Sequence, residues 1–284
     1  MRNSIKDYVK MCDACQRRKE GREFVAPLGD VDQPSAPFEV TSMDITVPYV
    51  LTPRKNKYLL TFIDHFTKYV EAKPISDQSA ETCARVYASQ IVTRHGTGSK
   101  IITDQGHLST FFQETCKILG IHKVNTTSYH PSSNGQIERL HRTLHTGLSH
   151  FVNSANNNWD VLVPFFLMAY RATPNTTTKY SPFYLLHGRE MPIPTNENLK
   201  AKISKENPSH SQRLENLKAS LRSAYKLVRG ASSRSHQNNN EYYDRKAKFR
   251  KFEVNDLVYL YNPAIKPGLS KKFKKMDGAV QGSN

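Results

Sequence analysis

The spacing of apolar residues predicts alternating strands and helices in the central part of the chain. Three apolar runs of strand length come first, and the polar stretch PRKNK separates the first two. Apolar positions at helical spacing then alternate with short strand-like runs. The strands are expected at 39–47, 58–64, 69–75, 100–103 and 123–126, and the helices at 79–93 and 109–119. This order predicts an α/β fold of the α+β kind, with three antiparallel strands in a mixed sheet flanked by helices.

A polar loop leads into a further helix within residues 126–151. Its apolar positions fall at steps of three and four: Ile137, Leu140, Leu144, Leu148 and Phe151. This spacing places them on one face, packed against a core. Glu138, Arg142 and His145 share a neighbouring polar stripe. Taken alone, the Glu138 and Arg142 pair has the spacing of an ordinary ion pair on a helix surface.

The remaining part of the chain is less regular. We expect a helix over 158–171, an irregular segment over 181–194, and a polar, charge-rich helix from 206 to 229 that extends into EYYDRKAK. A strand signal at 251–261 then begins a small β-domain, which ends after about two strands in a basic tail.

The chain is strongly basic. Its 284 residues carry a net charge of +16, which favours a polyanionic partner, and nucleic acid fits better than a membrane surface because no basic amphipathic helix with an aromatic face is found. No apolar run reaches the roughly 18 residues of a membrane span, and no secretory signal is present, so we expect no membrane segment and a reducing compartment. Cys83 and Cys116 lie in helical patterns and are expected in the core.

Cys12 and Cys15 form a CxxC pair near the N-terminus. Such a pair can supply half of a tetrahedral zinc site. The first histidine of the chain is His65, so two further ligands are missing from this segment. The pair is either an incomplete zinc site or two ordinary reduced cysteines, and the missing His pair argues against bound Zn²⁺.

Three carboxylates could converge if the predicted strands are neighbours. Asp44 lies within the first strand, Asp104 follows the strand at 100–103, and Glu138 lies on the helix described above. Converging carboxylates repel one another unless a cation lies between them, and hard oxygen ligands suit Mg²⁺ or Mn²⁺. Two such ions about 4 Å apart can activate the attacking oxygen and stabilise the leaving oxygen in phosphoryl transfer. The alternative is that each aspartate only forms a turn or caps a helix.

Six stretches along the chain, three of which contain these acids, resemble one family. They are MDITVPYV, KYLLTFIDHFTKYVEAKPI, IITDQG, YHPSSNGQIERLHRTL, MAYRATPNTTTKYSPFYLLHG and YYDRKAKFRKFEVNDLVYL. In this order they resemble retroviral-type integrases, specifically those of gypsy-type LTR retrotransposons. The resemblance implies a ribonuclease H-like five-stranded core and a two-metal site at Asp44, Asp104 and Glu138. It also implies 3′-end processing of element DNA and its transfer into target DNA by a homo-oligomer, made in the cytoplasm and acting in the nucleus.

The same resemblance suggests further DNA-contacting residues. His130, Asn134 and Gln136 would shape the active-site loop, and Arg139 and Arg142 would face DNA. The basic tail adds Lys271, Lys272, Lys274 and Lys275. The implied domains are a zinc-module remnant at 1–26, a linker at 27–38, the catalytic core at 39–195, a helical extension at 196–245 and a truncated basic SH3-like domain at 246–284.

The chain departs from the family pattern in three places. The zinc-binding module retains only its Cys pair, and the C-terminal β-domain is short. The 33 residues between Asp104 and Glu138 are about two fewer than in the family, beside a site where misplacing a ligand by an ångström can cost about a hundredfold in rate. These departures leave a second hypothesis open, namely a catalytically degraded integrase that still binds nucleic acid.

Overall fold

A computed structural model describes residues 2–12, 33–46, 48–104, 110–126, 135–193, 209–245, 257–259 and 279–281. The chain divides into two compact units, one of Val31–His236 and one of Met1–Asp30 together with Gln237–Asn284. Several predicted site residues lie outside the described residues: Cys15, His130, Asn134 and the four tail lysines 271, 272, 274 and 275. Asp104 is described as part of the backbone only.

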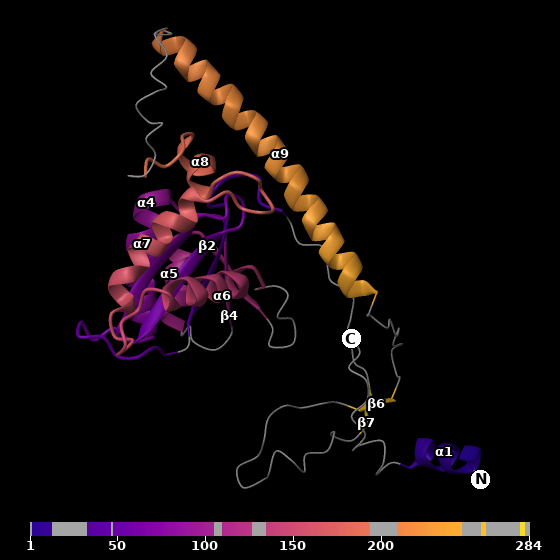
Figure 1. Ribbon diagram of the computed structural model, residues 1–284. Coiled ribbons are helices and arrows are strands. Elements are labelled where there is room, and N and C mark those ends of the chain that lie inside the picture. The colour runs from indigo at the N-terminus through magenta and orange to yellow at the C-terminus, as the bar shows by residue number, and fades with distance from the viewer. Residues whose placement is uncertain are drawn as a thin grey trace. The chain divides into compact units, whose positions relative to one another are not determined.

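The larger unit is built on a mixed five-stranded sheet (Figure 1). Its strands are β1 (Val40–Ile45), β2 (Tyr58–Asp64), β3 (Val70–Ile75), β4 (Lys100–Asp104) and β5 (His122–Thr126). In the order β3-β2-β1-β4-β5, the first three strands pair antiparallel, and β1 with β4 and β4 with β5 pair parallel. This ribonuclease H-like arrangement confirms the predicted fold class.

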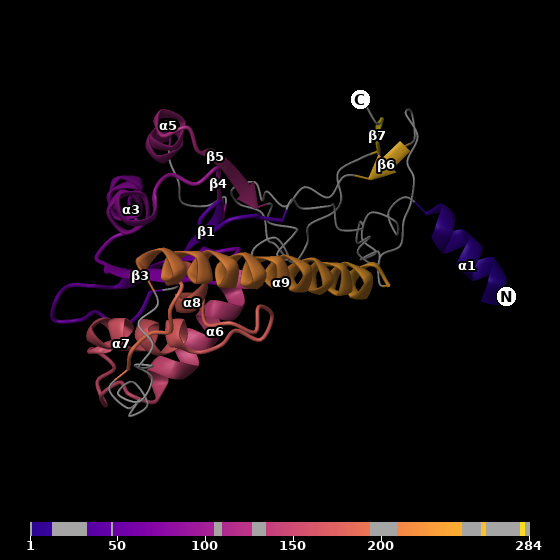
Figure 2. The same ribbon diagram turned by 90° about the horizontal axis from the view of Figure 1, so that it is seen from above.

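Helices cover both faces of the sheet (Figure 2). On one face lie α3 (Ala80–Tyr87), the π-helical segment η1 (Ala88–Val92), α4 (Thr93–His95) and α5 (Thr110–Ile118), and on the other lie α6 (Gly135–Ser149) and α7 (Trp159–Ala172). The helix predicted at 79–93 therefore continues to His95 through a π-helical segment. Ser79 begins it, since its hydroxyl accepts a hydrogen bond from the backbone N–H of Thr82.

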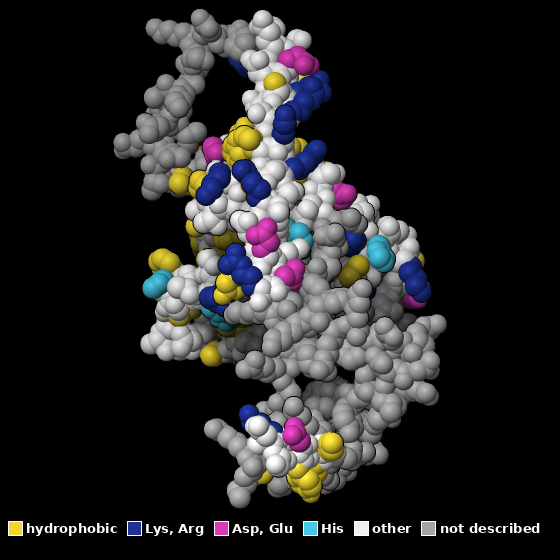
Figure 3. Space-filling model, turned by 90° about the vertical axis from the view of Figure 1, so that its right-hand side faces the viewer, with side chains coloured by type: hydrophobic (Ala, Val, Ile, Leu, Met, Phe, Trp, Pro, Cys, Tyr) yellow, Lys and Arg dark blue, Asp and Glu magenta, His cyan; other side chains and the backbone are white. Residues whose placement is uncertain are grey.

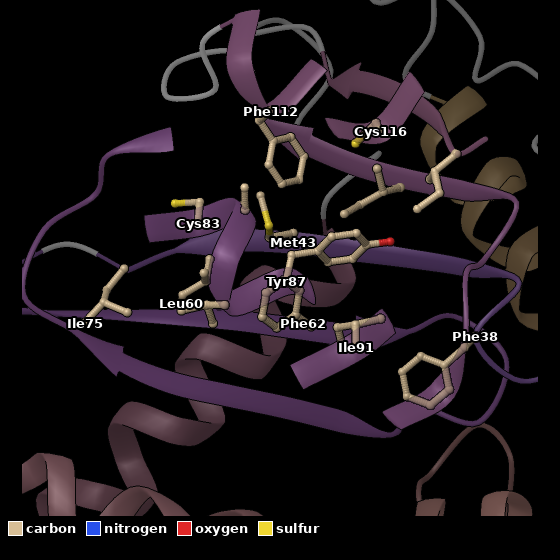
Figure 4. Packing of buried hydrophobic residues seen from close by; sticks show 14 of the residues in the cluster. Phe38, Met43, Leu60, Phe62, Ile75, Cys83, Tyr87, Ile91, Phe112 and Cys116 are labelled. Carbon is tan, nitrogen blue, oxygen red and sulfur yellow. The ribbon is translucent and has the colours of Figure 1, made fainter. Parts of the chain in front are cut away.

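The core has two layers because successive side chains of a strand point to opposite faces. Leu60 and Phe62 of β2 join the cluster under α3 and α5, shown in Figure 4. Leu59 and Ile63 of the same strand join the cluster under α6 and α7. Cys83 and Cys116 are both buried in the first cluster, as the sequence predicted.

Two sequence predictions are wrong in this unit. Phe151 is 73% exposed, because α6 ends at Ser149 before its apolar stripe reaches this residue. The segment predicted as irregular contains α8 (Pro182–His187). Ser181 caps its first turn and Gly188, with φ of 70°, ends it in the left-handed conformation that glycine adopts without strain.

The predicted charged helix is α9 (His210–Asp244), 35 residues long. Ala224 and Val228 pack with Phe66 and Leu185 in a small third cluster, and the hydroxyl of Tyr225 donates to the carbonyl of Leu185 at 2.9 Å. Figure 3 shows Lys and Arg side chains along the N-terminal half of α9. None of the helices in the described ranges combines the length and the apolar character that crossing a bilayer requires.

The smaller unit is described only in short pieces. They are α1 (Arg2–Met11), the end of α9 from Gln237 to Asp244, and the strands β6 (Leu257–Tyr259) and β7 (Ala279–Gln281), which pair antiparallel. Cys12, directly after α1, is half-buried. The predicted zinc pairing of Cys12 with Cys15 stays a prediction.

Candidate active site

The strand register brings two of the predicted acids together. In the parallel pair of β1 and β4, Val40 lies opposite Lys100 and Met43 lies opposite Thr103. One residue further along both strands, the backbone positions of Asp44 and Asp104 are therefore side by side. The strands at 39–47 and 100–103, which the sequence analysis required to be neighbours, are hydrogen-bonded neighbours.

Asp44 is held from two directions. Its Oδ1 accepts a hydrogen bond from the backbone N–H of Ile45 at 2.9 Å, and its backbone carbonyl accepts one from the hydroxyl of Thr61 at 3.1 Å. Thr61 lies directly opposite Asp44 on β2. The carboxylate of Asp44 is 25% exposed, so it combines a fixed backbone with access to solvent.

Helix α6 carries Glu138 to the same side of the sheet. Its residues Ile137, Leu140, Leu144 and Leu148 are buried in the cluster beneath α6 and α7. Glu138 itself is exposed. His141, three residues later and so on the same side of the helix, lies with its Nδ1 3.6 Å from Oδ2 of Asp44. The first turns of α6 therefore face the end of β1 that carries Asp44.

His141 belongs to this site, although the sequence analysis did not select it. Its Nε2 lies 2.7 Å from the hydroxyl oxygen of Thr61. The pKa of His141 is lowered to about 4, mainly by burial and secondly by the charge of His145. The ring is therefore neutral at pH 7. A neutral imidazole has one N–H donor and one acceptor nitrogen, and the two ring nitrogens of His141 lie against the Thr61 hydroxyl and the Asp44 carboxylate. The available signal was its position one turn after Glu138.

The other predicted residues of α6 have different surroundings. Gln136 is partly buried and its Oε1 accepts a hydrogen bond from Nζ of Lys68 at 3.0 Å. Arg139 and Arg142 are exposed, and Nε of Arg139 donates to the carbonyl of Gly135 at 3.0 Å. Within the described part of the chain, no ion pair joins Glu138 to Arg142, so the surface-pair interpretation of this stripe is not supported.

The donor set fits a hard divalent cation. Among the side chains that the structure describes, no three of the His, Cys, Asp and Glu residues are grouped to hold a metal, and the side chain of Asp104 is outside that set. The two described acids are both accessible to solvent, and all three candidates offer carboxylate oxygen. Such ligands suit a partly hydrated Mg²⁺ or Mn²⁺ better than Zn²⁺.

Comparison with known proteins identifies this unit. Residues 34–131 match the family described as Integrase core domain. The chain therefore contains an integrase core domain of the retroviral type. It is 29% identical over 266 residues, 92% of its length, to the retrovirus-related Pol polyprotein from transposon 412 of Drosophila melanogaster. It is 28% identical over 193 residues, 67% of its length, to the Gag-Pol polyprotein of avian reticuloendotheliosis virus.

The chain spans about a fifth of the length of these relatives, 21% of the first and 17% of the second. Among solved structures, a chain in the cryo-EM structure of the simian T-cell lymphotropic virus intasome in complex with the PP2A regulatory subunit B56 gamma is similar in fold. The TM-score is 0.51 at 22% identity, over 68% of this chain and 69% of that chain.

Proposed function

We propose that this chain is the integrase of a gypsy-type LTR retrotransposon, which trims the 3′ ends of element DNA and joins them to target DNA. The observation that carries the proposal is the pairing of β1 with β4, which sets Asp44 and Asp104 in adjacent backbone positions beneath the helix of Glu138. The match of residues 34–131 to the integrase core supports it.

Asp44, Asp104 and Glu138 are the proposed ligands for two Mg²⁺ or Mn²⁺ ions, with Asp44 and Asp104 at the first and Asp44 and Glu138 at the second. When bound, such ions activate the attacking oxygen and stabilise the leaving oxygen of a phosphodiester. The protein's own contribution is to fix the ligands. Thr61 and His141 contact Asp44, and the buried face of α6 holds the backbone that carries Glu138.

DNA binding is proposed to use cationic side chains near this site and in the C-terminal tail. Arg139 and Arg142 are exposed on α6, where they can neutralise phosphates. The loop residues His130 and Asn134 would add contacts to DNA near this site, and the basic tail would bind DNA phosphates separately. Contacts to phosphates displace condensed counterions, so affinity should fall steeply with salt and depend little on sequence.

The domain division given by the sequence is part of this proposal, as are a homo-oligomeric active form and action in the nucleus. The shortened spacing between Asp104 and Glu138 favours the second candidate, a degraded integrase that binds DNA without joining it. The two candidates share the fold and differ only in chemistry.

Strand transfer separates them. A duplex with a recessed 3′ end and a plasmid target are incubated with the chain in Mg²⁺ or Mn²⁺, beside D44N and E138Q variants and an E114Q control. Glu114 is an exposed acid on α5 that pairs only with Lys117 among the described residues. The proposal predicts joined product from the wild type and E114Q, and none from D44N or E138Q. Salt-sensitive DNA binding without product from any form would establish the degraded alternative.

A further inference from the structure

We propose that Lys68 is a positioning residue for Glu138, because it ties the turn between β2 and β3 to the first turn of α6. The inference rests on the proposed function, since it concerns the same acid. Lys68 is not one of the three proposed metal ligands, and it was not among the residues selected from the sequence. It touches none of the proposed ligands and acts through Gln136.

The tie consists of three hydrogen bonds. Nζ of Lys68 donates to the carbonyl of His65 at 2.6 Å and to Oε1 of Gln136 at 3.0 Å. The amide nitrogen of Gln136 donates to the carbonyl of Asp64 at 3.4 Å. Both ends of the Gln136 amide are therefore held by one turn of the chain, two residues before Glu138.

The turn that supplies these contacts is itself fixed. The side chain of Asp64 is fully buried. Its Oδ1 accepts hydrogen bonds from the backbone N–H groups of Phe38 and Phe66, and its Oδ2 accepts one from the N–H of Thr67. Lys68 adopts the left-handed conformation, with φ of 65°, and its own N–H donates to the carbonyl of Asp64 at 3.0 Å. The anchor for Gln136 is thus a tight turn and not a mobile surface side chain.

The first turn of a helix needs such support. Its first four N–H groups have no partner within the helix, so side-chain contacts decide how well it is ordered. Ile137 fixes one side of this turn by burial. Gln136 fixes the neighbouring side, about 100° away around the axis. Two adjacent anchors set the rotation of the turn and hence the direction of Glu138.

The surroundings of Lys68 indicate that global stability is not its main contribution. Burial lowers the pKa of Lys68 to about 8; the charge of Asp64 raises it and that of Arg139 lowers it further. His65, the other titratable neighbour, has its pKa lowered to about 3, first by burial, and is neutral. A lysine whose charge is disfavoured by burial destabilises the folded state at neutral pH. A methionine at this position keeps the aliphatic stem without that charge.

Amide hydrogen exchange of α6 tests whether the hydrogen bonds of Lys68 and Gln136 order the helix, and it does not require enzymatic activity. The full chain is compared with K68M, Q136M, the double variant and a K117M control, whose lysine is exposed and contacts only Glu114 within the described residues. We expect K68M to speed exchange of the amides of residues 139–142 about tenfold, which corresponds to one charge-assisted hydrogen bond, with K117M unchanged. The double variant should exchange like the faster single variant. Unchanged exchange in K68M, or additive effects of K68M and Q136M, would overturn the inference.

Strand-transfer kinetics provide the functional readout. Misdirected Glu138 should lower kcat of K68M about tenfold while KM for DNA stays as in the wild type. A rise in KM alone would mean that Lys68 binds DNA and would overturn the positioning role. If the wild type itself joins no DNA, the proposed function fails, whereas the exchange experiment still decides whether Lys68 orders α6.

Discussion

Replacement of His65 by glutamine should remove a large part of the acid sensitivity of the fold. His65 follows β2, and its Nε2 lies 2.7 Å from the hydroxyl oxygen of Ser42 on β1. Burial, together with the charges of Lys68 and Lys100, lowers its pKa to about 3. The unfolded chain has no such environment, so its histidine titrates near 6.5.

The size of the effect follows from proton linkage. Between these two pKa values the unfolded state binds one more proton than the folded state, so the free energy of unfolding falls as the pH drops below 6.5. Between pH 7 and pH 5, this single group should remove about 2 kcal/mol. The figure changes little if the folded pKa is 4 instead of 3, because both values lie below this window.

Urea unfolding of the wild type and H65Q at pH 7 and pH 5 measures the difference. All other titrating groups are common to both proteins, so they cancel in the comparison. The exposed His150 supplies a control variant, H150Q. Between pH 7 and pH 5, the free energy of unfolding of the wild type should fall by about 2 kcal/mol more than that of H65Q. The fall in H150Q should be about as large as in the wild type. Equal losses in the wild type and H65Q would refute the assignment of His65 as a histidine that is kept neutral by burial.

Three further substitutions test the packing around the site by chemical denaturation. Leu144 of α6 is fully buried, so L144A should cost about 2–5 kcal/mol of unfolding free energy; a loss below 1 kcal/mol would mean that α6 is not held by its apolar face. A Cβ on Gly98 would overlap the carbonyl oxygen of Phe38, so G98A should cost about 1–3 kcal/mol, and a stabilised variant would contradict this close approach. Glu71 is 3% exposed and pairs with the partly buried Arg171, so E71Q should cost about 3–5 kcal/mol; a neutral effect would exclude a structural ion network.

The fold was predictable where the sequence pattern and the tertiary structure agree. The apolar run of β2 begins and ends at the predicted residues, Tyr58 and Asp64, because both of its faces are buried. The adjacency of β1 and β4 was predicted as a condition for the acids to meet, and the register confirms it. Helix α8 was not predicted because its six residues are too few for the apolar pattern of a helix to repeat. Ser181 before it and Gly188 after it are nevertheless ordinary cap signals.

Side-chain partners across long sequence separations were not predictable. His141 meets Thr61 from a strand 80 residues earlier, and Lys68 meets Gln136 across 68 residues. Neither contact has a periodic or motif signal, since each depends on how α6 crosses the sheet. The sequence identified Glu138 through its neighbours along the chain, and the structure adds the residues that hold its helix in place.

The most direct test of the account is the effect of Mg²⁺ on thermal unfolding of the wild type and D104N. If Asp104 completes a cation site with Asp44 and Glu138, Mg²⁺ at ten times its dissociation constant should stabilise the wild type by about 1.4 kcal/mol. This corresponds to a rise of about 4 °C in Tm for a unit of this size. The account predicts that rise in the wild type and its loss in D104N. An equal rise in both proteins, or none in either, would contradict a shared metal site at the ends of β1 and β4.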